Sequence, residues 1–268
     1  GEKESSWELR GTEFHKQYPD DAELEFEKAR AIYEISVRRS FIYPRPLRID
    51  SLTGTIVYSA ISEMRSIRDV FLKYVCGLGS TGSAQDIFFE SGRVLAVIHD
   101  QLTLSRRDDW QPDEIFRSLL RDMPEAVGHE RRAFLHGDYG FANLFVVGDS
   151  ARLVVIDASP NYFVTFSAAC YGPVFVDIAN MLSCMEGLVP LSRHFRMRLA
   201  RVRELATVFL EGYESESEVD LDRSSLEQFT EATARSYLDY RFRSRILGRA
   251  GHLALYNSFR RSRLRPLV

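Results

Sequence analysis

Three oxygen-bearing side chains stand at a distinctive spacing near the middle of the chain. Asp138 closes the segment 136–138 (HGD), Asn143 follows five residues later, and Asp157 comes fourteen residues after Asn143. In phosphoryl-transfer enzymes, an Asp of the catalytic loop accepts the proton of the attacking hydroxyl, an Asn of the same loop holds a metal ion, and a second Asp joins metal and phosphates. The order and spacing predict this chemistry, with Asp138 as the base and Asn143 and Asp157 as Mg²⁺ ligands.

A β-hairpin should bring the two predicted metal ligands together. The apolar segments 144–147 and 152–156 predict two strands joined by a turn at 148–150. Asn143 precedes the first strand and Asp157 follows the second, so antiparallel pairing places both side chains at one end of the hairpin. Two oxygen ligands in that position can share Mg²⁺.

Each of these residues also has an ordinary structural interpretation. Asp138, Asn143 or Asp157 alone would more often be a turn or capping residue, because such side chains bond nearby backbone. His136 alone would more often be a buried core histidine, and we expect it to support the loop rather than to react. The combined pattern, with strands where the chemistry requires them, favours the functional interpretation.

The motifs resemble those of the aminoglycoside phosphotransferase family, which also includes choline, homoserine and methylthioribose kinases. The resemblance rests on residues 134–144 (FLHGDYGFANL), 155–157 (VID), 172–173 (GP) and 176–179 (VDIA). It implies an α+β, two-lobed, protein-kinase-like fold with a small amino-terminal lobe and a mainly helical carboxyl-terminal lobe. It also implies an enzyme that uses ATP and Mg²⁺ to phosphorylate a hydroxyl of a small molecule, such as an aminoglycoside, sugar or amino alcohol, with Asp177 bracing the catalytic loop.

Two departures from the family pattern bear on the metal site and the substrate. Asp157 is followed by Ala158 and Ser159, where the family commonly has Phe and Gly or a similar pair. The link formed by residues 161–171 is longer and more aromatic than usual. Its aromatic side chains either line the acceptor pocket or pack the link onto the protein, and the sequence favours neither reading.

Lys16 is expected to hold the phosphates of the nucleotide. It is one of only four lysines, and it lies in the segment 14–18, whose alternation predicts a strand. A helix is predicted next, at 20–35, and kinases pair such a lysine with a Glu of that helix. Glu27 is the predicted partner, with Glu23 in reserve, and the alternative is that Glu27 belongs to a solvated helix face.

The extended segment 55–61 resembles the strand that joins the two lobes of a kinase. Its last residues, Ser59, Ala60 and Ile61, are the candidates for backbone hydrogen bonds with adenine. Beyond this hinge, apolar residues at helical spacing predict that much of the chain is helical. The predicted helices span residues 66–75, 84–102, 174–185, 193–213, 224–240 and 241–264.

The domain boundary is expected after this hinge, with the amino-terminal lobe in residues 1–61 and the helical lobe in residues 62–268. A kinase of this kind covers the triphosphate with a glycine-rich loop. Before Lys16 the sequence has only Gly1 and Gly11, and no initiator methionine. We therefore expect the chain to lack its first strands and phosphate loop, the alternative being a reduced amino-terminal lobe.

Composition indicates one soluble unit of kinase size, which we expect to be cytoplasmic. A chain of 268 residues can bury a large core, and its formal net charge of -3 argues against a bulk nucleic-acid binder. No apolar run reaches the roughly 18 residues that a membrane-spanning helix needs. Cys76, Cys170 and Cys184 are widely spaced and predict reduced thiols rather than a disulfide framework or a metal site.

Charge along the carboxyl-terminal part bears on the type of substrate. Acidic residues gather at 211–222 and arginines at 235–265. Acidic groups beside the acceptor would attract a cationic aminoglycoside or amino alcohol, whereas arginines there would prefer an anionic sugar. The usual alternative for both stretches is a solvated surface.

Two other functions compete with a small-molecule kinase. A nucleotide-binding pseudokinase is suggested by Ala158 and Ser159 after Asp157, and by the missing glycine-rich loop. A Ser/Thr protein kinase is disfavoured, because Gly137 replaces the usual Arg of the catalytic loop and no Ala-Pro-Glu follows Asp157.

Overall fold

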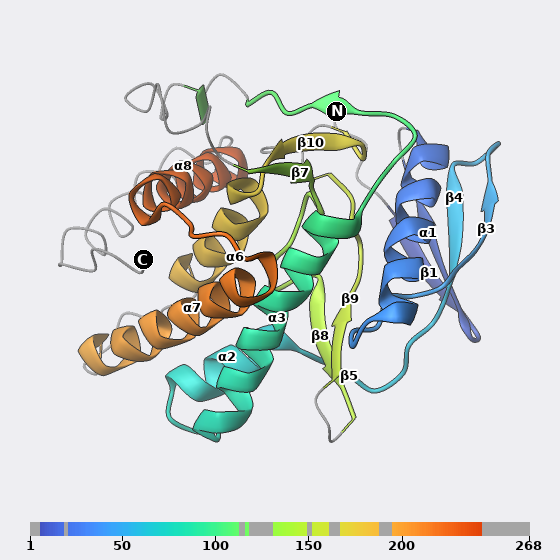
Figure 1. Cartoon of the computed structure of the whole chain (residues 1–268). Helices are drawn as coiled ribbons and strands as arrows, with labels where there is room; N and C mark the ends of the chain where they lie inside the picture. Colours follow the sequence, from blue (N-terminus) through green and yellow to red (C-terminus); the bar gives the residue numbers. More distant parts are fainter. Residues whose placement is uncertain are drawn as a thin grey trace.

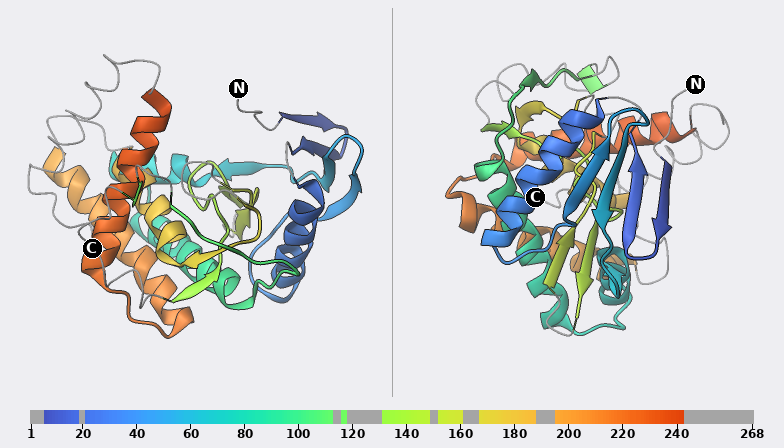
Figure 2. Two further views of the ribbon diagram at one scale, coloured as in Figure 1. Left: turned by 90° about the horizontal axis from the view of Figure 1, so that it is seen from above. Right: turned by 90° about the vertical axis from the view of Figure 1, so that its right-hand side faces the viewer.

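The structure is a computed structural model that describes residues 6–18, 21–112, 116–117, 131–148, 152–160, 167–187 and 195–242. A four-stranded antiparallel sheet lies at one end of the molecule, and most of the long helices lie at the other (Figure 1). The left view of Figure 2 shows the same separation. This is the α+β, two-lobed organisation that the sequence predicts.

The smaller end consists of the sheet and one helix beside it. The strand order is β1-β2-β4-β3, and the strands are β1 (Ser6–Arg10), β2 (Glu13–Gln17), β3 (Pro46–Asp50) and β4 (Thr55–Ser59). Helix α1 (Ala22–Arg38) is capped by Asp21, whose carboxylate accepts a hydrogen bond from Leu24 N at 3.4 Å. Ile32 and Ile35 are buried at the three-residue spacing of one helical face.

The predicted hairpin is confirmed. Strand β8 (Leu144–Val147) pairs antiparallel with β9 (Arg152–Val155). Just beyond the ladder, Ile156 N donates a hydrogen bond to Asn143 O at 3.0 Å. Asn143 and Asp157 therefore lie at the same end of the hairpin.

Two segments connect this hairpin to the smaller end of the molecule. Strand β5 (Met64–Ser66), which follows β4 after a short connection, pairs antiparallel with β8. Ile42, which follows α1, donates to Leu153 O and accepts from Val155 N, each at 2.9 Å. The hairpin is thus hydrogen-bonded both to the α1–β3 connection of the smaller end and to the strand that follows that end.

In the part of the chain that the structure describes, the larger end contains five helices, two of which approach closely at a pair of glycines. The helices are α2 (Ile67–Val75), α3 (Thr81–Gln101), α6 (Phe175–Gly187), α7 (Phe195–Ser217) and α8 (Arg223–Phe242). Helices α3 and α7 cross at Gly92 and Gly212. A Cβ at Gly92 would lie 1.9 Å from Phe209 O, and one at Gly212 would lie 2.1 Å from Phe89 O. Only glycine lets the two backbones approach this closely.

A short three-stranded sheet contains the strand that leads into the catalytic loop. Its order is β6 (Asp108–Asp109), β10 (Cys170–Pro173) and β7 (Arg132–Phe134), with β7 antiparallel to β10. The short apolar run 133–135 (AFL) predicts a buried strand, and β7 covers its first two residues. The chain then enters the loop 136–143 and leaves it through β8.

Most predicted helices correspond to observed ones with boundaries shifted by a few residues. The segment 66–75 matches α2, 84–102 matches α3, and 174–185, 193–213 and 224–240 match α6, α7 and α8. The helix predicted at 241–264 lies outside the described residues except for its first two. None of the helices in the described segments is long and apolar enough to cross a membrane. The three cysteines are free thiols in the structure.

Candidate active site

The catalytic loop is held by a buried carboxylate on α6. Asp177 Oδ2 accepts a hydrogen bond from His136 N at 2.6 Å, and Oδ1 accepts one from Gly137 N at 2.9 Å. Gly137 has φ +97°, and a Cβ there would lie 2.9 Å from Ser159 O, so a larger residue would strain the loop and meet the chain after β9. The structure places Asp177 where the resemblance implies a bracing residue.

Asp177 is itself fixed by two residues that sequence reasoning missed. His99 Nε2, on α3, lies 3.0 Å from Asp177 Oδ2, and His99 Nδ1 lies 2.9 Å from Tyr213 Oη on α7. Burial would raise the pKa of Asp177, but the hydrogen bond and charge of His99 and the Gly137 N–H outweigh it and hold the pKa below its usual value. An anionic carboxylate therefore anchors the loop.

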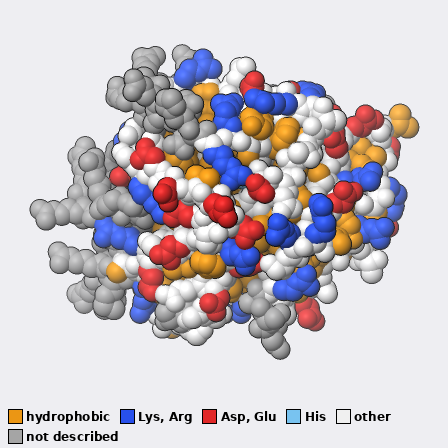
Figure 3. All heavy atoms as spheres, in the orientation of Figure 1, with side chains coloured by type: hydrophobic (Ala, Val, Ile, Leu, Met, Phe, Trp, Pro, Cys, Tyr) orange, Lys and Arg blue, Asp and Glu red, His pale blue; other side chains and the backbone are white. Residues whose placement is uncertain are grey.

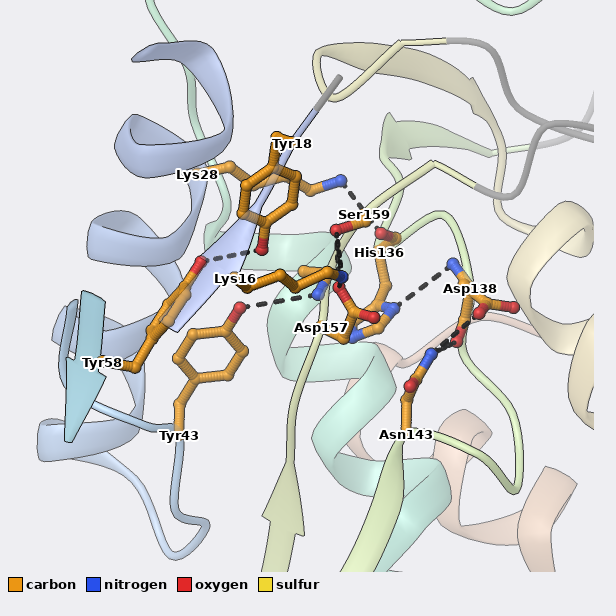
Figure 4. A network of polar contacts seen from close by, with 11 residues as sticks. Lys16, Tyr18, Lys28, Tyr43, Tyr58, His136, Asp138, Asn143, Asp157 and Ser159 are labelled. Carbon is orange, nitrogen blue, oxygen red and sulfur yellow. Dashed lines mark hydrogen bonds and ion pairs between the residues drawn. The ribbon is translucent and has the colours of Figure 1, made fainter. Parts of the chain in front are cut away.

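His136 has the environment of a scaffold residue. Its side chain is fully buried, and this burial lowers its pKa to about 4, so the ring is neutral at pH 7. Its Nδ1 accepts a hydrogen bond from Asp138 N at 3.4 Å (Figure 4). The ring thus helps to shape the turn that presents Asp138.

Two carboxamides orient the side chain of Asp138. Asn143 Nδ2 donates to Asp138 Oδ2 at 2.8 Å and to Asp138 O at 2.9 Å. Asn180 Nδ2, on α6, donates to Asp138 Oδ1 at 3.2 Å. Each carboxylate oxygen can accept more than one hydrogen bond, so both retain capacity for a substrate hydroxyl.

Asn180 was not among the residues predicted from sequence. It lies three residues after Asp177, and this spacing puts both side chains on the same face of α6. Asp177 binds the backbone of the catalytic loop, while Asn180 binds the side chain of Asp138. The three-residue spacing was the available sequence signal, but it shows neither which way the helix faces nor what it contacts.

Asn143 and Asp157 fit a magnesium ion that arrives with a nucleotide. Because the amide nitrogen of Asn143 is directed at Asp138, its oxygen is left to act as a ligand. The Asp157 side chain is 29% exposed. Within the described segments, no group of three His, Cys, Asp or Glu side chains could hold a metal ion by itself. Mg²⁺ is often held by one or two protein carboxylates together with substrate phosphates, so this small set of ligands is sufficient.

Lys16 and Ser159 meet at the same carboxylate (Figure 4). Lys16 Nζ forms an ion pair with Asp157 Oδ1 and lies 3.4 Å from Ser159 Oγ. The Ser159 hydroxyl donates to the same Asp157 oxygen at 2.5 Å. Burial would raise the pKa of Asp157, but Lys16 and Ser159 outweigh it and hold the pKa below its usual value, so Asp157 is anionic. Ser159, which departs from the family pattern, is therefore part of the site.

The structure does not bring the predicted Glu27 to Lys16. The Glu27 carboxylate accepts hydrogen bonds from Ser105 N and Ser105 Oγ, both at 2.6 Å. The reserve candidate, Glu23, does not pair with Lys16 either. It is exposed, and its carboxylate accepts a hydrogen bond from Ser51 Oγ at 3.2 Å. A Glu two positions away from the required one points to a different side of the helix, because each residue turns about 100°.

The acidic residue of α1 that faces the site is Glu25. It is 6% exposed, and burial raises its pKa to about 7. The charges of Lys28, Asp157 and Lys16 also act on it. A sequence signal for Glu25 existed, because it lies seven residues before Ile32, on the face that becomes buried.

The predicted adenine-binding segment is partly occupied by the protein's own hydrogen bonds. Ser59 N donates to Arg45 O at 2.9 Å, and Ala60 N donates to Thr12 O at 2.9 Å. These two N–H groups are therefore committed within the sheet. A contact with adenine remains a prediction for the N–H of Ile61 and for the carbonyl groups of this segment.

Two residues of the acidic stretch near the carboxyl end form ion pairs within the protein. Glu216 pairs with Arg93 at 3.0 Å, and Glu214 pairs with Arg223 at 2.5 Å, so the acidic stretch serves ion pairs. Most of the arginine-rich stretch lies outside the described residues. On the face in Figure 3, acidic and basic side chains are interspersed rather than gathered by sign.

The aromatic link after Asp157 is described only at its end. Tyr171, on β10, packs against Phe134 with ring centroids 5.3 Å apart, and Arg107 Cζ lies 3.7 Å from the centre of its ring. For Tyr171 this supports packing rather than a place in a pocket. The other aromatic residues of the link, Tyr162, Phe163 and Phe166, lie outside the described residues.

No protein-family model matches this sequence, and no curated protein matches it. Solved structures with the same fold include a glucosamine kinase (14% identity, 95% of this chain and 74% of that chain, TM-score 0.63). A choline/ethanolamine kinase family protein from Mesorhizobium loti is 11% identical over 97% of this chain and 86% of that chain, with a TM-score of 0.61. A macrolide 2′-phosphotransferase from Brachybacterium faecium is 12% identical over 95% and 84%, with a TM-score of 0.51.

Proposed function

From its fold, which is that of the protein-kinase-like small-molecule kinases, and from the geometry of its site, we propose that this chain transfers the γ-phosphoryl group of ATP to a hydroxyl of a small molecule. The observation that carries the proposal is that two pairs of side chains lie at the same end of the hairpin: Lys16 with Asp157, and Asn143 with Asp138. One solved structure with this fold is a glucosamine kinase in complex with glucosamine, ADP and inorganic phosphate, which supports nucleotide use.

In the proposed reaction, Asp138 accepts the proton of the substrate hydroxyl. The hydroxyl oxygen forms a bond to the γ-phosphorus, and the bond from that phosphorus to the bridging oxygen of ADP breaks. Asn143 and Asn180 hold the Asp138 carboxylate in one orientation, which supplies the positioning on which such reactions depend.

The triphosphate of the nucleotide would lie against Lys16 and Asp157, which form an ion pair with each other in the structure. Asn143 and Asp157 would hold Mg²⁺, which neutralises charge on the phosphates when it is bound. Lys16 would contribute its ammonium group to the phosphates. We place the adenine beside Ile61, at the end of the proposed nucleotide-binding lobe, residues 1–61, with the acceptor on the side of residues 62–268.

A screen of metabolite extracts with γ-labelled ATP and Mg²⁺ would test the proposal. The wild-type chain is compared with Asp138→Asn and with Asp69→Asn, a control on the exposed face of α2. We expect a labelled product with the wild type and the control. The Asp138 variant should lose at least about 100-fold in rate, the usual range for a general base. A labelled product formed equally well by Asp138→Asn would refute the role of Asp138.

A second candidate function is nucleotide binding without transfer. It is supported by Ser159, which binds Asp157 where the family has a smaller residue. This alternative predicts that the wild type binds ATP in calorimetry yet labels no acceptor in the same screen.

A further inference from the structure

Lys28 is completely buried, which is rare for a lysine. It lies on α1, in the smaller lobe, yet its Nζ donates a hydrogen bond to His136 O in the catalytic loop at 2.9 Å (Figure 4). The bond therefore runs from one lobe to the other. Because Lys28 is sealed from solvent, it is not the ammonium group that meets the nucleotide, which distinguishes it from Lys16.

The group that Lys28 binds belongs to a peptide unit held from both sides. The peptide between residues 136 and 137 consists of His136 C=O and Gly137 N–H. Lys28 holds the oxygen, and Asp177 Oδ1 holds the N–H at 2.9 Å. One holding residue comes from α1 and the other from α6, so the orientation of this peptide depends on both lobes.

This peptide needs to be held because of Gly137. Glycine adopts positive and negative φ with similar ease, so rotation of the peptide before it meets little steric resistance. Here φ of Gly137 is +97°, and the next residue is the proposed base Asp138. Rotation of the 136–137 peptide would redirect the chain immediately before that carboxylate.

Acidic groups surround the buried amine of Lys28 and favour its charged form. Burial lowers its pKa, whereas the charges of Glu25 and Asp177, and more weakly those of Cys170 and Asp157, act in the opposite direction. Glu25 lies three residues earlier on the same helical face. The lysine is thus placed between acidic groups of α1 and acidic groups of the site.

We propose that Lys28 is a positioning residue for phosphoryl transfer, which fixes the 136–137 peptide and so couples α1 to the orientation of Asp138. The inference rests on the proposed function for its effect on rate, but not for its effect on the loop. The competing explanation is that Lys28 only balances the buried charge of Glu25.

Two variants separate these explanations. Lys28→Met keeps the length of the side chain and removes the donor, but leaves Glu25 without its buried cationic neighbour. Lys28→Met combined with Glu25→Leu removes both groups, so the double variant regains the stability that the single variant loses. Lys73→Met, at an exposed position on α2, serves as the control.

Three quantities are measured for each variant: the melting temperature, the rate of amide hydrogen exchange in residues 134–141, and kcat with the dissociation constant of MgATP. With the double variant, we expect exchange at Gly137 to be at least tenfold faster and kcat to be at least tenfold lower, with MgATP affinity within about twofold of wild type. Exchange in residues 223–236 of α8 should not change.

Wild-type exchange at Gly137 and wild-type kcat in the double variant would overturn the proposal and leave Lys28 as a charge partner only. If the wild-type chain transfers no phosphate to any acceptor, the proposed function fails. The exchange rate at Gly137 still decides whether Lys28 fixes the loop, so the two failures are distinguishable.

Discussion

Asn180 donates a hydrogen bond from Nδ2 to Asp138 Oδ1 at 3.2 Å, one helical turn after Asp177 on α6. The helix that anchors the backbone of the catalytic loop therefore also orients the side chain of the proposed base. In Asn180→Leu, the carboxylate loses a donor that favours its charged form, so the acid limb of the pH profile of kcat should move to higher pH. We expect kcat to fall about tenfold to 100-fold, in the range for a misplaced catalytic group, with little change in KM for ATP.

Asn180→Asp provides the matched comparison. It replaces the donor by a second carboxylate, so the shift of the acid limb should be larger than in Asn180→Leu. Identical pH profiles in the wild type and both variants would show that Asn180 does not act on Asp138.

Ser159→Ala should weaken the binding of MgATP. The hydroxyl of Ser159 donates to Asp157 at 2.5 Å and lies 3.4 Å from Lys16 Nζ, so it helps to hold the anionic carboxylate that we assign to the metal. A hydrogen bond to a charged group contributes about 1.5–3 kcal/mol, of which solvent and the ligand replace a part. We expect a five- to tenfold higher dissociation constant by titration calorimetry at about pH 7, and a smaller change for ATP with EDTA. Equal losses for both ligands would exclude a role of Ser159 at the metal site.

Glu25→Gln should change how the stability of the protein depends on pH. Burial raises the pKa of Glu25 from 4.5 to about 7 in the folded protein. Between these two values the folded state binds more protons than the unfolded state, so the free energy of unfolding falls as pH rises through this window. The glutamine cannot ionise, so the free energy of unfolding of Glu25→Gln, relative to that of wild type, should be higher at pH 8 than at pH 4.5. Loss of the acidic neighbour of the buried Lys28 lowers the stability of the variant at both pH values.

Denaturant unfolding at several pH values measures this difference. Glu34→Gln is the matched control, because Glu34 lies at an exposed position of the same helix. It should follow the pH dependence of the wild type. A constant difference between Glu25→Gln and wild type at all pH values would contradict the assignment.

Gly92→Ala should destabilise the protein by about 3 kcal/mol or more, at the upper end of the usual cost of overpacking. The added Cβ would lie 1.9 Å from Phe209 O, so α3 and α7 would have to separate. Gly82→Ala, in the first turn of the same helix, is the control, since nothing lies within 4 Å of its Cβ position. That change should be neutral or slightly stabilising, because alanine has the higher helix propensity. Equal melting temperatures for the two variants would contradict the close crossing.

Features that depend on residues close together in the sequence could be predicted from it. Contacts between side chains that are far apart in the sequence could not. The hairpin follows from two apolar segments and a turn, and it places Asn143 and Asp157 together without further information. The caps of α1 and α2 follow from Asp21 and Ser66 in the same way.

The prediction of Glu27 rather than Glu25 as the glutamate that faces the site shows the limit of prediction from local sequence. Both lie on a correctly predicted helix, but the side of the helix that faces the site depends on packing against the sheet and the catalytic loop. Lys28 and Asn180 were not predicted as site residues for the same reason, since each bonds a group more than 40 residues away in sequence. The committed N–H groups of Ser59 and Ala60 likewise depend on how the strands and their connections pair.

The ion pair between Lys16 and Asp157 also sets a condition on ligand entry. A free divalent cation that approached Asp157 would leave the ammonium group without its counter-charge, and a bare triphosphate that approached Lys16 would do the same to the carboxylate. Only a ligand that presents both signs of charge at once offers each side chain a new partner in the same event. If the chain binds nucleotide as we propose, the affinities for magnesium and for nucleotide should therefore be thermodynamically linked, each raising the other by the same factor.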